Sequence, residues 1–146
     1  MINQEKMTLS KDVYQALIEH AKSLAPIESC GYLAGKEQRL LRFFPMINKD
    51  NREDHFSFDP KEQFQVVKEA RADELDLLAV YHSHPKSPAR LSAEDVSLFN
   101  DEQMLYLILS LNEAQPVLKG FRIKKPSQTE IRVDEVLLEI DEKGSK

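Results

Sequence analysis

Residues 77–95 have the sequence LLAVYHSHPKSPARLSAED, and this stretch is the starting point for predicting the fold. It begins with an apolar run of strand length, Leu77 to His82, which is typical of a central strand buried on both faces. Pro85 ends the strand. The segment Ser92-Ala-Glu-Asp95 then has the pattern of a helix capping box. The stretch therefore predicts a strand, a short loop and the start of a helix.

Two histidines stand at the end of the predicted strand. Side chains alternate between the two faces of a strand, so His82 and His84 project from the same face. Asp95 falls in the first turn of the predicted helix, from which its carboxylate can return to the same place. Two imidazoles and one carboxylate bind zinc and leave a fourth position for water, as a catalytic site requires.

Each of these residues also has a simpler explanation when it is taken alone. Two histidines at this spacing can be a chance surface pair, and Asp95 can be a helix-capping acid. Ser92 can be an N-cap, and Glu28 can be a loop carboxylate. Only the joint order of the residues favours a site.

That joint order resembles the signature of the JAMM/MPN+ metalloprotease family. The signature is an upstream glutamate, then His-Ser/Thr-His-Pro, six residues, a serine, two residues and an aspartate. Here the same order is Glu28, residues 82–85, six residues, Ser92 and Asp95, with no departure in spacing. Residues 26–35 and 56–60 also resemble the compact prokaryotic members, so the likeness covers nearly the whole chain.

The resemblance implies a role for each residue. One zinc per chain would be held by His82, His84 and Asp95. Glu28 would be the general base that takes a proton from water and passes it to the leaving amine. Ser92 would donate a hydrogen bond to the oxyanion of the tetrahedral intermediate. The implied fold is a curved mixed β-sheet flanked by helices, similar to that of cytidine deaminases.

Three further residues are predicted to lie outside this chemistry. Cys30 is interpreted as a small buried hydrophobe, because the family's site does not use it. His20 and His55 fit no ligand spacing and are predicted to be structural or solvated.

Strands and helices alternate along the rest of the chain, which predicts an α/β (α+β) fold. A helix from Ser10 to Ala25 ends before Pro26, and its core face is expected to carry Val13, Leu17, Ala21 and Leu24. A second helix begins at Asp59-Pro60 and runs to about Ala72, with predicted core contacts at Phe64, Val67 and Ala70. Between these helices and after them, strands are predicted at Cys30–Gly35, Arg39–Phe44, Leu105–Leu111, Val117–Ile123 and Ile131–Ile140.

Composition sets the outer limits on function. The 146 residues fit one domain, 1–146, and 41% hydrophobic and 31% charged residues describe a soluble globular protein. The net charge of −5 disfavours nucleic acid as a partner, and no apolar run is long enough to span a membrane. The single cysteine and the absence of a secretory signal over Met1–Lys6 predict a cytoplasmic location.

Other families with a His-x-His pair fit the sequence less well. A metallo-β-lactamase-like site would require Asp and His where Lys86 and Ser87 stand. An amidohydrolase would require a barrel of about 250 residues. A non-catalytic MPN domain that serves as a scaffold stays open as an alternative from a different class.

The resemblance also implies a substrate class. Family members cleave peptide or isopeptide bonds after the C-terminal glycines of ubiquitin-like proteins, and short prokaryotic members are associated with sulfur carrier proteins. The expected partner is therefore a ubiquitin-like or sulfur carrier protein that ends in Gly-Gly. A generic small-peptide or amide metallohydrolase is the alternative, and the sequence predicts no oligomeric state.

Overall fold

The computed structural model describes residues 4–53 and 56–141. His55, which is predicted above to be structural or solvated, lies outside the described residues. The elements follow one another as β1 (Lys6–Ser10), α1 (Lys11–Leu24), β2 (Cys30–Lys36), β3 (Arg39–Met46), α2 (Pro60–Ala72), β4 (Asp76–His84), α3 (Ala93–Leu98), β5 (Leu105–Ser110), β6 (Val117–Lys124) and β7 (Arg132–Asp141).

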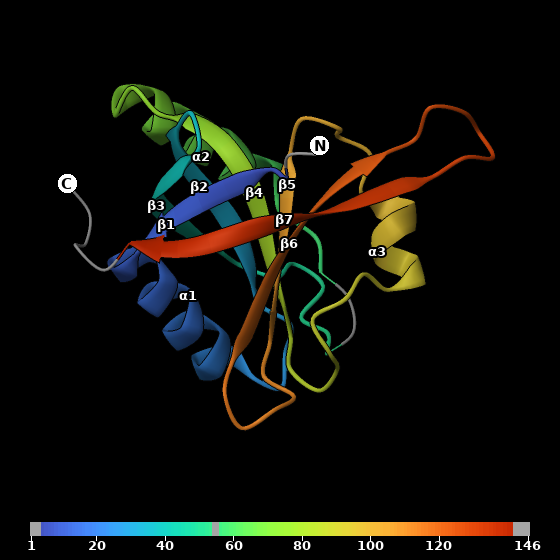
Figure 1. The fold of residues 1–146 in the computed structure, drawn as a ribbon. Helices are drawn as coiled ribbons and strands as arrows, with labels where there is room; N and C mark the ends of the chain where they lie inside the picture. Colours follow the sequence, from blue (N-terminus) through green and yellow to red (C-terminus); the bar gives the residue numbers. More distant parts are fainter. Residues whose placement is uncertain (1–3, 54–55, 142–146) are drawn as a thin grey trace.

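The strands form one mixed, strongly curved sheet in the order β1-β3-β2-β4-β5-β6-β7, and it closes where β1 pairs with β7. Figure 1 shows β1 and β7 side by side at this closure. β4 is central, antiparallel to β2 and parallel to β5. The predicted α+β fold with a curved mixed sheet is confirmed, and the prediction of β4 as a buried central strand is confirmed as well.

β1 was not predicted from the sequence. It has five residues and leads directly into α1, so it leaves little room for a period-two pattern. Met7 and Leu9 are buried because β1 pairs with β7 and β3, which are remote in sequence. The strand exists through these tertiary contacts.

The two long helices, α1 and α2, have N-cap residues at their predicted starts. Ser10 Oγ accepts a hydrogen bond from the Val13 N–H at 3.2 Å, and Asp59 Oδ1 accepts one from the Lys61 N–H at 3.0 Å. In α1, Val13, Leu17 and Ala21 are buried as expected. Leu24, in the last turn, is 37% exposed, so its placement on the core face was wrong.

The predicted core face of α2 needs a correction. Val66 and Ala70 are buried against a cluster with Phe44, whereas Phe64 is 66% exposed. One helical residue advances about 100°, so Phe64 lies about 200° from Val66 and faces away from the sheet. Val67 is half-buried and Ala70 is a core contact as predicted.

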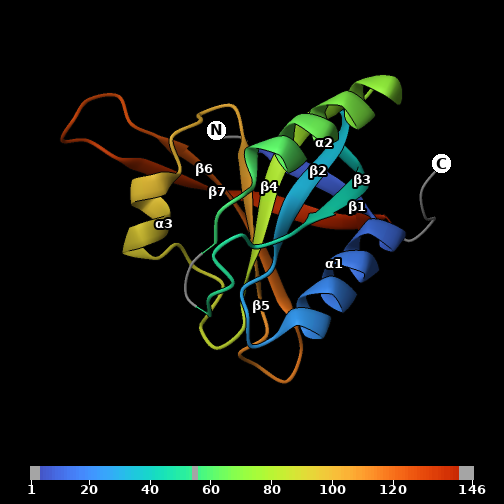
Figure 2. The ribbon, with the colours of Figure 1, turned by 180° about the vertical axis from the view of Figure 1, so that it is seen from behind.

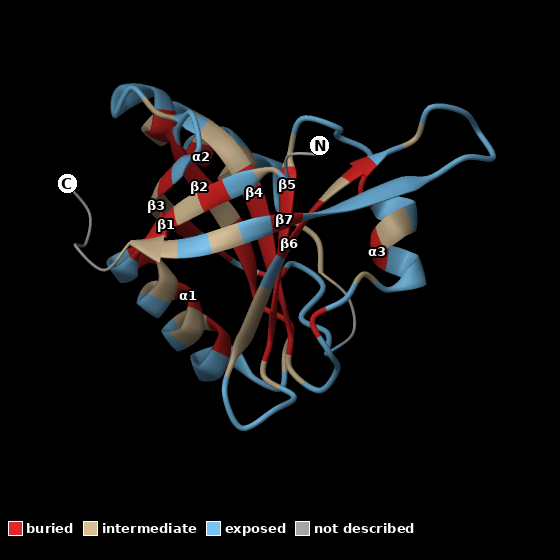
Figure 3. Cartoon of the chain, viewed as in Figure 1, coloured by how far each residue is buried: buried red, intermediate tan, exposed pale blue. Residues whose placement is uncertain are grey.

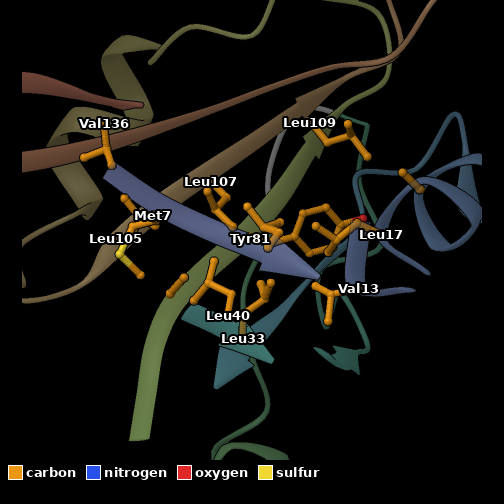
Figure 4. Close-up of a cluster of buried hydrophobic side chains, with 13 residues drawn as sticks. Met7, Val13, Leu17, Leu33, Leu40, Tyr81, Leu105, Leu107, Leu109 and Val136 are labelled. Carbon is orange, nitrogen blue, oxygen red and sulfur yellow. The ribbon is translucent and has the colours of Figure 1, made fainter. Parts of the chain in front are cut away.

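The main core lies between α1 and the strands that it covers. Figure 4 shows Leu17, Tyr81, Leu107 and their neighbours meeting there, and Figure 3 shows that buried residues follow β2, β4 and β5 through the molecule. α2 packs elsewhere on the sheet, and α3 lies apart from α1 and α2, as Figure 2 shows from behind. The C-terminal end of β4 is therefore surrounded by the loops that follow β3 and β4.

Replacing Leu107 with alanine should lower the free energy of unfolding by about 2–5 kcal/mol, because this side chain is completely buried and leaves a cavity. Leu137→Ala is the matched control, since Leu137 in β7 is 46% exposed. Urea unfolding measures both free energies, provided that the dependence of the free energy on urea concentration is the same as in the wild type. Equal losses at the two positions would contradict the assignment of Leu107 to the core.

Candidate metal centre and active site

His82, His84 and Asp95 converge at the end of β4. The two histidine Nε2 atoms are 3.1 Å apart. Asp95 Oδ1 lies 3.2 Å from His82 Nε2, and Asp95 Oδ2 lies 3.3 Å from His84 Nε2. All three residues are buried, and one potential ligand atom of each falls within 4.8 Å of the others. The structure thus brings the three predicted ligands together.

The start of α3 delivers Asp95 to the histidines. Ser92 Oγ accepts a hydrogen bond from the Asp95 N–H at 3.0 Å, and Asp95 Oδ2 accepts one from the Ser92 N–H at 3.0 Å. The capping box predicted from the sequence is therefore present. The same carboxylate also faces the histidines, so capping and ligation are compatible roles of one side chain.

The hydrogen bonds of the two histidine rings determine which of their nitrogen atoms face Asp95. His84 Nδ1 lies 2.9 Å from the Pro88 carbonyl oxygen and donates to it, so in the neutral ring the lone pair is on Nε2, which faces the other ligands. His82 Nδ1 is buried without a hydrogen-bond partner among the described residues, so the polar contacts of this ring are on its Nε2 side. A lone pair opposite a carboxylate requires a cation, and this donor set fits a metal ion.

The three side chains also shift one another's pKa values. Burial lowers the pKa of His82 and favours the neutral ring. Burial also opposes ionisation of Asp95, but the His82 and His84 rings beside it hold the pKa of this carboxyl well below its ordinary value. For His84, burial is outweighed by Asp95 and the Pro88 carbonyl, which raise its pKa.

Aromatic side chains enclose the His82 ring. Phe56 stacks on it with ring centroids 4.9 Å apart, and Phe99 meets it edge-on at 5.5 Å. Phe99 in turn stacks on Tyr106 at 4.1 Å. These apolar walls keep water from one side of the cluster and strengthen the electrostatic interactions inside it. Sequence reasoning missed both phenylalanines as parts of the site, because their contact with His82 depends on loop packing.

Glu28 lies two residues before the start of β2 and is buried. Cys30 pairs with His82, and the Ser83 N–H donates to the Ser29 carbonyl at 2.9 Å, so continuing this antiparallel register places Glu28 opposite His84. Residues opposite each other in a sheet point to the same face. The Glu28 charge contributes to the raised pKa of His84, which indicates proximity. The structure therefore sets the predicted base beside the predicted ligands.

Ser92 is exposed at the rim of the cluster. Its oxygen accepts the capping hydrogen bond described above, which uses one lone pair of the hydroxyl. The hydroxyl hydrogen is still available to donate, because a serine can accept and donate at the same time. The cap therefore does not exclude the predicted role of Ser92.

Cys30 and His20 have no place among the candidate ligands. The Cys30 Sγ is buried against the Met46 carbonyl, and burial, with the charges of Glu62 and Glu28, raises its pKa to about 12. The thiol is therefore protonated at neutral pH, which fits its interpretation as a small buried group. His20 lies 3.4 Å from the Tyr81 hydroxyl and packs against Phe43, so its role is structural as predicted.

Comparison with known proteins identifies the family. The model for prokaryotic homologs of the JAB domain matches residues 10–124. The chain belongs to this family. The JAMM/MPN+ resemblance is thereby confirmed.

Two relatives and one solved structure illustrate the likeness. The CysO-cysteine peptidase of Mycobacterium tuberculosis is 31% identical over 134 residues, which are 89% of this chain and 91% of the relative. The desampylase of Pyrococcus furiosus is 30% identical over 97 residues, 66% of this chain and 69% of the relative. The crystal structure of a JAB1/MPN domain protein from Archaeoglobus fulgidus shares the fold, with a TM-score of 0.54, 20% identity and coverage of 93% and 98%.

No helix in the described ranges 4–53 and 56–141 has the length and apolar character needed to cross a membrane. The location predicted from the sequence stays a prediction.

Proposed function

We propose that this JAB-family chain is a zinc metalloprotease that hydrolyses the peptide or isopeptide bond after the C-terminal Gly-Gly of a ubiquitin-like or sulfur carrier protein. The observation that carries the proposal is the convergence of His82, His84 and Asp95 on the sheet face that also bears Glu28. The names of the relatives, a CysO-cysteine peptidase and a desampylase, support hydrolysis of such conjugates.

Zinc is the proposed metal, at one ion per chain. Two imidazole nitrogens and one carboxylate oxygen form a ligand set used by catalytic zinc sites. When bound in such a site, zinc lowers the pKa of water to about 7 and polarises a carbonyl.

The side chains around the metal would divide the remaining work. Glu28 would accept a proton from water and deliver it to the leaving amine. Ser92 would donate its free hydroxyl hydrogen to the oxyanion that develops on the scissile carbonyl. Phe56 and Phe99, which enclose His82, would keep bulk water away from these charges.

Ser92→Ala should lower kcat by about 10²–10³, the usual loss for one oxyanion donor, while zinc is retained. The variant also loses a helix N-cap, which costs about 1 kcal/mol of stability. Ser10→Ala is the matched control, because Ser10 caps α1 with the same type of hydrogen bond. We expect this control to lose stability and to keep the wild-type kcat. A similar kcat in both variants would argue against Ser92 as a catalytic residue.

The approach to the metal favours a substrate without side chains. Tyr32 and Phe58, with ring centroids 4.9 Å apart, pack against the same apolar cluster as Phe56, the ring that stacks on His82. Leu91, in the loop between β4 and α3, packs against this cluster as well. Lys86, in the loop after β4, forms an ion pair with Glu53, in the loop after β3. A diglycine tail has no side chains, so it could approach the metal in extended form among these bulky groups, whereas a branched residue would bring additional bulk close to them.

A ubiquitin-like protein ending in Gly-Gly and fused to a short C-terminal extension should be cut after the second glycine. Mass spectrometry should detect release of the intact Gly-Gly form. A Val-Val version should react at least about 10²-fold more slowly, the loss expected when the carbonyl is misplaced by about 1 Å. A Gly-Gly fusion with an altered extension is the control and should be cut normally. Equal cleavage of the Val-Val fusion would favour the generic peptidase, and absence of any turnover would favour the scaffold.

A further inference from the structure

Asn48 is a buried amide in the loop that follows β3, with 6% of its surface exposed. Its Nδ2 donates to the Glu28 carbonyl at 2.9 Å and to the Arg52 carbonyl at 3.4 Å. The Glu28 N–H donates to the same Arg52 carbonyl at 2.9 Å. The N–H and the carbonyl of Glu28 are therefore both held by residues 48–52.

The oxygen of the same amide holds the segment that precedes α2, next to Phe56. Asn48 Oδ1 accepts hydrogen bonds from the Asp50 N–H at 3.0 Å and from the Ser57 N–H at 3.3 Å. The Lys49 N–H donates to the Ser57 carbonyl at 2.9 Å and reinforces this connection. Ser57 is the neighbour of Phe56, whose ring stacks on His82. The Asn48 side chain thus links the main chain of Glu28 to the loop that carries Phe56, which packs against the candidate metal ligand His82.

The chemistry of this position suits an asparagine. The asparagine amide provides two N–H donors and one accepting oxygen at the end of a short side chain. An aspartate of the same size has no N–H donor, and a leucine has neither a donor nor an acceptor. A lysine or arginine could also hold the Glu28 carbonyl. However, its positive charge would favour the ionised form of a nearby carboxylate and weaken it as a base. A neutral amide holds Glu28 without this effect.

We propose that Asn48 is a positioning residue that fixes Glu28 relative to His82, His84 and Asp95. The inference rests on the proposed function, in which Glu28 is the base. General-base catalysis depends on geometry, because the base must stay within hydrogen-bond reach of the proton that it takes. Releasing the main chain of Glu28 should therefore affect the chemical step more than substrate or metal binding.

Asn48→Ala should lower kcat on the Gly-Gly fusion by about 10–100-fold, with KM changed less than about threefold and zinc retained. Asn100→Ala is the matched control, because it removes an exposed amide that donates to the Leu98 carbonyl, and its kcat should stay at the wild-type value. In a Glu28→Gln background the Asn48→Ala change should have little further effect, because a base that is absent cannot be misplaced. A wild-type kcat in Asn48→Ala, or the same fold loss in the Glu28→Gln background, would overturn the proposal.

Amide hydrogen exchange tests the same inference without any substrate. In Asn48→Ala, the amides of Glu28, Asp50 and Ser57 should exchange at least about tenfold faster than in the wild type, while amides of β5 keep their protection. Unchanged exchange at Glu28 would overturn the positioning role. If the wild type cleaves no Gly-Gly fusion, the proposed function fails, and the exchange measurement still decides whether Asn48 holds Glu28.

Discussion

Purified protein should contain about one zinc per chain, and His82→Ala, His84→Ala and Asp95→Ala should each reduce the zinc content to a small fraction of that value. Activity should fall with the metal by at least about 10³-fold, since water without zinc returns to its bulk pKa of about 15.7. Metal analysis and turnover of the Gly-Gly fusion measure the two effects on the same samples.

His20→Ala is the control for this set. His20 bonds to Tyr81 and is not part of the convergent cluster, so its replacement should leave the zinc content unchanged. The three ligand variants should keep their far-ultraviolet circular dichroism, because His82, His84 and Asp95 are not part of the hydrophobic core around Leu107. Full zinc occupancy in all three ligand variants would show that the site was assigned wrongly.

Glu28→Gln should keep zinc and lose kcat by about 10²–10⁴, the usual contribution of a general base. Glutamine preserves the size of the side chain and removes its ability to take a proton. Glu113→Gln makes the same chemical change on the exposed loop after β5 and should leave kcat unchanged. Hydrolysis by Glu28→Gln at the wild-type rate would refute the mechanism, while loss of zinc from this variant would assign Glu28 to metal binding.

The convergence of His82, His84 and Asp95 could be predicted from the sequence because its geometry is largely local. His82 and His84 share a face through strand alternation, and Asp95 lies at a fixed position in a capping box. Each constraint spans few residues. Glu28 is remote in sequence, so its position came from the family resemblance, and the pairing of β2 with β4 supplies the physical reason for it.

The features that the sequence did not predict depend on long-range packing. Phe56 and Phe99 surround His82 only because two loops fold back over the end of β4, and no period or spacing signals this contact. The buried face of α2 could not be decided from its composition, since Phe64 is more apolar than several residues that are less exposed. The role of Asn48 likewise depends on a loop without regular structure.

The pairing of β1 with β7 also has a consequence for the kinetics of folding. Lys6 pairs with Leu137 and Leu9 with Ile140, so this closure joins segments near opposite ends of the described chain. Contacts with such large sequence separation raise the contact order of the native state and slow folding. Until β7 is in place, β1 lacks its longest pairing partner, and Met7 and Leu9 lack part of the surface that covers them. Completion of the barrel is therefore expected late on the folding pathway, after α1 and the central strands have assembled.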